Sequence, residues 1–142
     1  MKIVLDTNVL ISGMLNPFGP PGRIVDLLRS GVLRLTVDDR ILLEYTEVLR
    51  RDYFLRYFGK SEREDIIEYF VKNSCYTLSR IVLNDLPDPD DLPFLEIALT
   101  AAVPLITGNL KHYPENARMG CVVVSPRQFM DEILVKRQDD RE

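Results

Sequence analysis

The sequence has few of the residues that mark several common classes of protein. It contains two cysteines, one histidine and no tryptophan among 142 residues, so neither a disulfide framework nor a zinc site of Cys and His fits it. Cys75 and Cys121 are expected to be buried, reduced thiols. No apolar run approaches the roughly 18 residues of a membrane span. Asp6 lies where a signal peptide would have its apolar run, so we expect a cytoplasmic protein with no membrane contact.

An excess of basic side chains is also missing. Lys and Arg total 18 against 22 Asp and Glu, which gives a formal net charge of −4. A protein that held nucleic acid by bulk charge would be basic, so any such binding must be local or bridged by metal ions. The sequence has no Walker loop, no G-x-G-x-x-G and no serine elbow. Candidates for local phosphate contacts, which solvated helix faces would equally explain, are Arg23, Arg50, Arg51, Arg56 and Lys111.

What is present is the composition of one globular domain, with 46% apolar and 28% charged residues. Without repeats or long linkers, we predict a single domain over residues 1–135 and a frayed polar tail over residues 136–142. Strand and helix patterns alternate, which favours a mostly parallel α/β sheet covered by helices on both faces. Strands are expected at residues 2–5, 32–37, 76–83, 105–107 and 121–125, and helices from about residue 8 and at 23–30, 39–51, 61–72, 91–102 and from 126.

Sheets of this kind bind ligands at the carboxyl ends of their strands, and polar residues stand at these ends. Asp6 directly follows the first strand, where it could also simply cap the next helix. Glu44 has apolar neighbours at helical spacing, so it lies on or beside an apolar face, whereas Glu47 has arginines there and is expected in solvent. A carboxylate near a core needs a cation, a metal or a shifted pKa. Glu44 is therefore a site candidate.

Two further segments supply candidates. Four acids crowd into residues 85–91, which indicates either a solvated loop with one helix cap or a cation site. We select Asp91, nearest the following helix, and Asp90 second. Asn109 follows the fourth strand and is a weak neutral ligand or a turn residue. His112 is expected in a loop, although it could touch phosphate. Carboxylates with an amide suit Mg²⁺ or Mn²⁺ and predict metal-dependent phosphodiester chemistry.

The order of four short segments resembles the PIN-domain family of ribonucleases, particularly VapC-like toxin components of toxin–antitoxin pairs. The resemblance covers residues 1–134 and implies a three-layer α/β/α sandwich with a five-stranded parallel sheet in the order 3-2-1-4-5. It places the family's acidic positions on Asp6, Glu44 and Asp91 and the fourth on Asn109, with Asn8 and Thr107 as supporting residues. The segments are Ile3-Val4-Leu5-Asp6-Thr7-Asn8, Ile41-Leu42-Leu43-Glu44, Asp88-Pro89-Asp90-Asp91 with Phe94-Leu95-Glu96-Ile97-Ala98, and Leu105-Ile106-Thr107-Gly108-Asn109.

The resemblance implies an endoribonuclease in which Asp6 and Asp91 hold Mg²⁺ or Mn²⁺ and Glu44 helps to hold the ion or orients water. Asn109 and Thr107 would position water or substrate. The implied partners are RNA, a small antitoxin protein and, as an open alternative, a second copy in a homodimer. Because Asn109 lacks a charge, a catalytically weak or inactive RNA- or protein-binding module stays open. A phosphatase or receiver domain is less favoured, since residues 6–8 lack paired acids.

Overall fold

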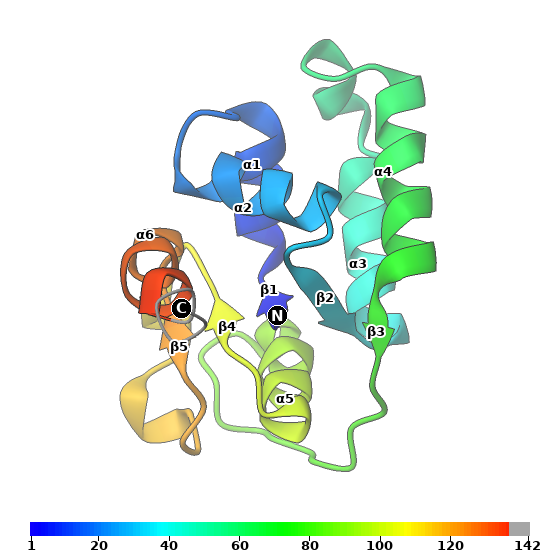
Figure 1. Ribbon diagram of the computed structural model, residues 1–142. Coiled ribbons are helices and arrows are strands. Elements are labelled where there is room, and N and C mark those ends of the chain that lie inside the picture. The colour runs from blue at the N-terminus through cyan, green and yellow to red at the C-terminus, as the bar shows by residue number, and fades with distance from the viewer. Residues whose placement is uncertain (137–142) are drawn as a thin grey trace.

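The computed structural model describes residues 1–136 and has five short parallel strands surrounded by helices (Figure 1). The sheet has the predicted order β3-β2-β1-β4-β5, and every neighbouring pair is parallel. Lys136, the first residue of the expected tail, still lies in a helix, and the rest of that tail is outside the described residues. The strands are β1 (Lys2–Leu5), β2 (Arg34–Val37), β3 (Cys75–Tyr76), β4 (Leu105–Ile106) and β5 (Val123–Val124).

Helices cover the sheet on both faces, as the sequence predicts. Four helices, α1 to α4, lie above the sheet in the view of Figure 1. The helix α5 lies below the sheet and contacts β1, β2 and β4. The α-helices are α1 (Thr7–Leu15), α2 (Pro20–Arg29), α3 (Asp39–Leu49), α4 (Lys60–Asn73), α5 (Leu92–Ala101) and α6 (Pro126–Gln128), which the π-helix η5 (Phe129–Leu134) continues. Short 3₁₀ turns are η1 (Asp52–Arg56), η2 (Pro89–Asp91), η3 (Leu110–His112) and η4 (Glu115–Ala117).

Local chemistry explains where several elements begin and end. The α2 helix starts at Pro20, ahead of the expected residue 23, because two prolines fit a first turn that needs no N–H donors. The Asp38 side chain accepts a hydrogen bond of 3.0 Å from the Ile41 amide and caps α3. The backbone of Ala102 adopts the left-handed helical conformation (φ 55°), which ends α5. Both cysteines are free and half-buried, so burial is less complete than expected.

The expected third strand over residues 76–83 is wrong. Only Cys75 and Tyr76 pair with β2, and the amide of Thr77 makes one more bond, of 2.9 Å, to Val37 before the chain leaves the sheet. The apolar side chains that indicated a strand have nothing to cover, since Leu78 and Val82 are 86% and 89% exposed. A strand at the edge of a sheet buries little apolar surface, so an apolar sequence pattern alone does not determine how far the strand extends.

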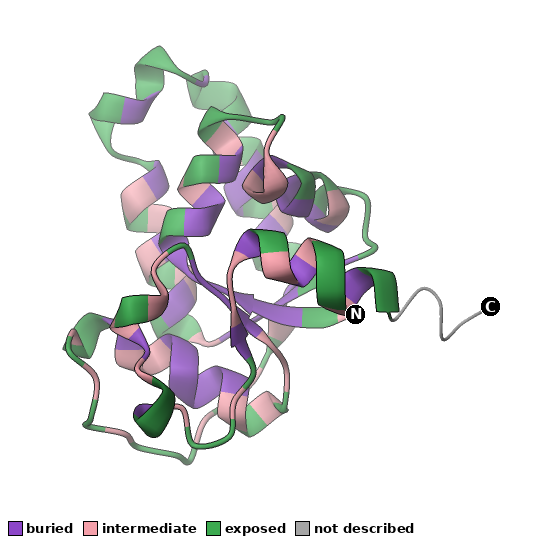
Figure 2. Ribbon diagram, turned by 90° about the vertical axis from the view of Figure 1, so that its left-hand side faces the viewer, coloured by how far each residue is buried: buried purple, intermediate pink, exposed green. Residues whose placement is uncertain are grey.

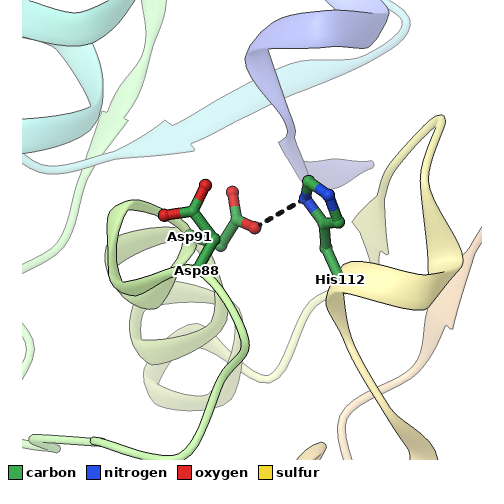
Figure 3. A group of neighbouring side chains, drawn as sticks. All are labelled: Asp88, Asp91 and His112. Carbon is green, nitrogen blue, oxygen red and sulfur yellow. Dashed lines mark ion pairs between the residues drawn. The ribbon is translucent and has the colours of Figure 1, made fainter.

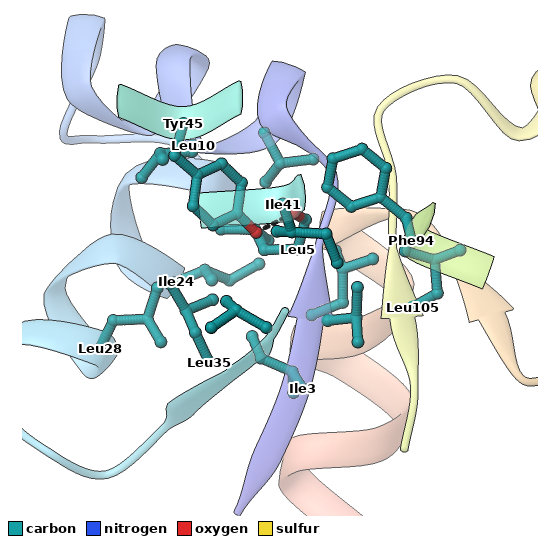
Figure 4. Close-up of a cluster of buried hydrophobic side chains, with 14 of the residues drawn as sticks. Ile3, Leu5, Leu10, Ile24, Leu28, Leu35, Ile41, Tyr45, Phe94 and Leu105 are labelled. Atoms are coloured by element: carbon teal, nitrogen blue, oxygen red, sulfur yellow. Dashed lines mark hydrogen bonds between the residues drawn. The ribbon is translucent and has the colours of Figure 1, made fainter. Parts of the chain in front are cut away.

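The core lies on both sides of the central strand. Ile3, Val4 and Leu5 are all fully buried, as is typical of a parallel strand covered on two faces, and Figure 2 shows the same strand as a buried ribbon through the molecule. Figure 4 shows side chains of α1, α2 and α3 packed over the sheet, with Phe94 of α5 beside them. Among the described residues, no helix is long and apolar enough to cross a membrane.

Candidate active site

Asp6 lies at the point where the strand order reverses, between β1 and β4. Its side chain is buried, and its Oδ2 accepts hydrogen bonds of 2.9 Å from the Thr107 hydroxyl and 3.1 Å from the Tyr113 hydroxyl. Asp6 also occupies the N-cap position of α1, yet these two donors come from the chain after β4. Burial raises the pKa of Asp6, and the hydroxyl donors oppose that rise. The residue is thus held in one orientation at the edge where ligands bind such sheets.

Glu44 is brought to the same edge by α3. It is half-buried, and its Oε2 accepts a hydrogen bond from the Thr7 hydroxyl, directly after Asp6. Burial is the main cause that raises the pKa of Glu44, and the charges of Asp6, Asp90 and Asp88 add to it. Glu47 is exposed, as the helical spacing predicts. Glu44 and Asp6 therefore belong to one cluster of like charges.

Asp91 ends η2 at the start of α5 and is 8% exposed. Its Oδ2 lies 2.9 Å from Nδ1 of His112 but makes no aligned hydrogen bond within residues 1–136. Burial and then the charge of Asp6 raise the pKa of Asp91 to about 6, although the neighbouring His112 lowers it. A buried carboxylate oxygen without a well-aligned donor is costly, and a bound cation would compensate it.

Asp88 and His112 are the neighbours of Asp91 that sequence reasoning missed. One ligand atom from each of these three residues lies within 4.8 Å of the others (Figure 3). Asp88 stands one 3₁₀ turn before Asp91, a spacing that could have indicated a shared face. His112 lies in the short turn η3 rather than in an irregular loop, and this turn places it beside Asp91 at the start of α5. Asp90 is exposed, and its amide donates a 3.0 Å bond to Asp88 Oδ1.

The remaining candidates link the start of α1 to the loop that follows β4. Asn8 is exposed, and its Oδ1 accepts a 3.1 Å bond from the Gly108 amide. Thr107 is fully buried; besides donating to Asp6, its hydroxyl accepts a 3.1 Å bond from the amide of half-buried Asn109. Tyr113 is buried as well, and nothing in its local sequence indicated that its hydroxyl would reach Asp6. The first turn of α1 and the loop after β4 are therefore fixed to each other around the acidic cluster.

The donor set decides which cations could bind. Asp6, Glu44 and Asp91 offer only carboxylate oxygens, which suit hard ions such as Mg²⁺ or Mn²⁺. The second set of Asp88, Asp91 and His112 includes an imidazole, which suits transition metals better. Asp91 belongs to both sets, and its buried Oδ2 is the atom that most needs a positive partner. The site therefore fits a divalent cation on the chemistry of its own residues.

Comparison with known proteins shows the family and the fold of the chain. The family model of the PIN domain matches residues 2–111. An uncharacterized protein of Methanocaldococcus jannaschii is 28% identical over 141 residues, covering 93% of this chain and 91% of that protein. Two solved structures share the fold. One is VapBC2 from Rickettsia felis bound to a promoter DNA fragment (TM-score 0.56, 12% identity, 88% of this chain and 98% of that chain). The other is VapBC-1 from nontypeable Haemophilus influenzae (TM-score 0.55, 18% identity, 89% and 99%).

Proposed function

Because the chain belongs to the PIN-domain family, we propose that it is a divalent-metal-dependent endoribonuclease that hydrolyses phosphodiester bonds in RNA. The observation that carries the proposal is the crowding of buried Asp6 and Asp91 with half-buried Glu44 and Asp88. Burial raises the pKa of Asp6, Glu44 and Asp91, and the charge of Asp6 raises the pKa of Glu44 and of Asp91 further, a cost that a cation would relieve. Few structural roles would justify that cost at the ligand-binding edge of a parallel sheet.

In this proposal Asp6, Glu44 and Asp91 hold Mg²⁺ or Mn²⁺. A bound divalent cation polarises the phosphoryl group and activates water for attack. Thr107 and Tyr113 keep the Asp6 carboxylate in place through its Oδ2. Thr7 occupies Oε2 of Glu44, so Oε1 is the oxygen that we assign to orienting the attacking water. Asn109, with Asn8 and exposed Asp90 at the rim, would position the water or the substrate.

The same proposal includes a biological setting. The likeness of the fold to the two VapBC complexes supports a toxin component that is held by a small antitoxin protein. A toxin of this kind acts on RNA in the cytoplasm, and we therefore expect the protein to be cytoplasmic. The proposal includes a homodimer, and light scattering of the purified protein measures the oligomeric state.

A second candidate function is an RNA- or protein-binding module that cleaves weakly or not at all. The observation that favours it is Asn109, which stands at the position where the family carries a fourth acid and which adds no charge to the site. Fewer negative ligands mean weaker attraction for a divalent ion.

A cleavage assay separates the two candidates. Purified protein is incubated with single-stranded RNA in Mg²⁺, in Mn²⁺ and in EDTA, alongside the Asp6→Asn variant and a control, Asp65→Asn, at an exposed position of α4. The nuclease proposal expects cleavage that needs metal, is lost in Asp6→Asn and persists in Asp65→Asn. Cleavage that survives EDTA or Asp6→Asn would contradict it. Binding of RNA without cleavage by the wild-type protein would favour the module.

A further inference from the structure

Two tyrosines stand in solvent on the turn between α3 and α4. Tyr53 and Tyr57 are 56% and 52% exposed, their ring centroids lie 5.6 Å apart and their hydroxyls 3.3 Å apart. The Arg56 guanidinium lies 5.2 Å from the centroid of the Tyr53 ring. Figures 1 and 2 place this turn at the top of the molecule, where nearly all of it is exposed. We call Tyr53, Tyr57 and Arg56 the aromatic platform.

The platform is held in place by buried aromatic neighbours. Phe54 and Phe58 are 8% and 4% exposed and stack on each other with their centroids 5.8 Å apart. Phe54 also contacts the Tyr53 ring edge-on at 5.2 Å. Exposed and buried rings thus alternate along residues 53–58, so the exposed rings are presented on a fixed base. Rings held in this way lose little conformational entropy when a partner covers them.

The segment that carries the platform is net positive in a chain that is acidic as a whole. Residues 50–60 carry four basic side chains and one acid, whereas the full chain has a net charge of −4. Arg50 is bound to Glu64 through two contacts of 3.1 and 2.8 Å, but Arg51, Arg56 and Lys60 are exposed. A partner for flat rings with local positive charge should itself offer flat faces and negative charge. Single-stranded nucleic acid has both, because its bases stack on aromatic rings and its phosphates pair with basic side chains.

The platform is also continuous with the helix that carries Glu44. From Glu44 to the end of α3 at Leu49 is about 8 Å along the helix axis, and η1 follows after two residues. We propose that the aromatic platform stacks the bases of single-stranded RNA whose backbone continues along α3 to the acidic cluster. This inference rests on the proposed nuclease function, to which it adds a base-stacking subsite for the unpaired RNA substrate. The bases of a duplex are already stacked on each other and cannot cover the tyrosines.

Binding is measured in EDTA, where the proposed metal-dependent cleavage does not occur, with a short fluorescent single-stranded RNA. Matched probes are an abasic oligomer of the same length and an RNA duplex. Tyr53→Ala and Tyr57→Ala are each expected to weaken single-strand affinity about tenfold, since base–ring stacking is lost, with little effect on the abasic oligomer. Tyr53→Phe, which keeps the ring, and Tyr76→Ala, an equally exposed tyrosine on β3, should bind within about twofold of wild type.

Three outcomes overturn the inference: unchanged affinity in both alanine variants, an equal loss for the abasic oligomer, or preference for the duplex. A shift in oligomeric state by light scattering with unchanged RNA affinity would also overturn it and assign the platform to a protein contact. Thermal melts confirm that each variant folds. Since the assay needs no cleavage, platform binding with no metal-dependent nuclease activity would reject the proposed function alone. Cleavage with platform-independent binding would reject only the platform.

Discussion

The hydroxyl of Tyr45 donates a hydrogen bond to the backbone carbonyl of Leu5, the last residue of β1. Its chain neighbour Glu44 accepts a hydrogen bond from Thr7 on the other side of Asp6. Two consecutive residues of α3 therefore form hydrogen bonds to the junction of β1 and α1, one on each side of Asp6. The position of the Glu44 carboxylate consequently depends on the buried side chain of the neighbouring Tyr45.

Tyr45→Phe tests this dependence. The substitution removes one buried hydroxyl without opening a large cavity, so the free energy of unfolding should fall by about 1–2 kcal/mol. Cleavage of RNA should fall as well, because α3 is released from the β1 junction and Glu44 is less well placed. Urea unfolding and single-turnover cleavage measure the two effects.

The control is Tyr69→Phe on α4, whose hydroxyl donates a 2.9 Å bond to the Leu28 carbonyl. It should lose stability to a similar degree, yet its folded fraction should cleave at the wild-type rate. Equal losses of cleavage in both variants would show that Tyr45 acts only through overall stability.

The parallel α/β architecture was predictable because it depends on rules that act along the whole chain, whereas the strand order was implied only by the resemblance to the PIN-domain family. Alternating strand and helix patterns indicate a parallel sheet, and the residues that come directly after parallel strands lie at one edge of that sheet. This rule alone brings Asp6 and Thr107 together from positions about a hundred residues apart. The segment 76–83 failed because its apolar pattern had no partner surface to cover, which a sequence does not reveal.

The composition of the site was harder to predict than its position. Asp91 could be selected from four nearby acids, since it precedes a helix that fixes it. Asp88 was missed although its spacing to Asp91 indicates a shared face, and His112 and Tyr113 could not be selected, because the conformation of η3 and the residue after it decides whether they face the cluster. Such short turns are set by local hydrogen bonds, among them the 3.1 Å bond from the Asn109 amide to Thr107, rather than by a repeating pattern.

The metal-free protein should become more stable relative to Asp91→Asn as the pH falls. The pKa of Asp91 is raised to about 6 from an ordinary value of 3.8, so the folded state binds this proton more tightly than the unfolded state. Ionised Asp91 thus destabilises the fold above about pH 6, and that cost disappears toward pH 4. In EDTA, Asp91→Asn should be the more stable protein at pH 7.5, with the difference shrinking at pH 4. Urea unfolding across this range measures it, and a difference that grows on acidification would contradict the prediction.

His112→Ala decides between the two sets of metal donors. If Asp6, Glu44 and Asp91 hold the ion, Mg²⁺ and Mn²⁺ affinity should stay within about threefold of wild type, because these ions prefer oxygen ligands. Binding of Ni²⁺ or Zn²⁺ through the imidazole should be lost. Calorimetric titration of each ion measures both. Lys111→Ala is the control, since it is an exposed neighbour in the same turn. A tenfold or larger loss of Mn²⁺ affinity in His112→Ala alone would place His112 among the ligands of the catalytic ion.

Asn109→Asp should strengthen the metal site. Asn109 is half-buried in the loop after β4 and adds no charge, while a carboxylate there would join Asp6, Glu44 and Asp91. Divalent metal should therefore bind more tightly, with Mn²⁺ the easiest ion to detect. Without metal, a fourth like charge should lower the melting temperature or leave it level, so the shift on adding Mn²⁺ should grow. Calorimetric titration and thermal melts with and without Mn²⁺ measure these effects.

The cleavage rate of Asn109→Asp then distinguishes two roles for the natural amide. If metal occupancy limits the wild-type enzyme, the added carboxylate raises the rate at low Mn²⁺ and the advantage disappears when Mn²⁺ is saturating. If the Asn109 amide donates a hydrogen bond to the RNA phosphate, a carboxylate repels that phosphate and the rate falls at every Mn²⁺ concentration. Asn109→Ala separates these roles further, because it removes the donor without adding charge. An Asn109→Asp protein with unchanged Mn²⁺ affinity and an unchanged metal-dependent melting shift would make Asn109 a turn residue outside the site.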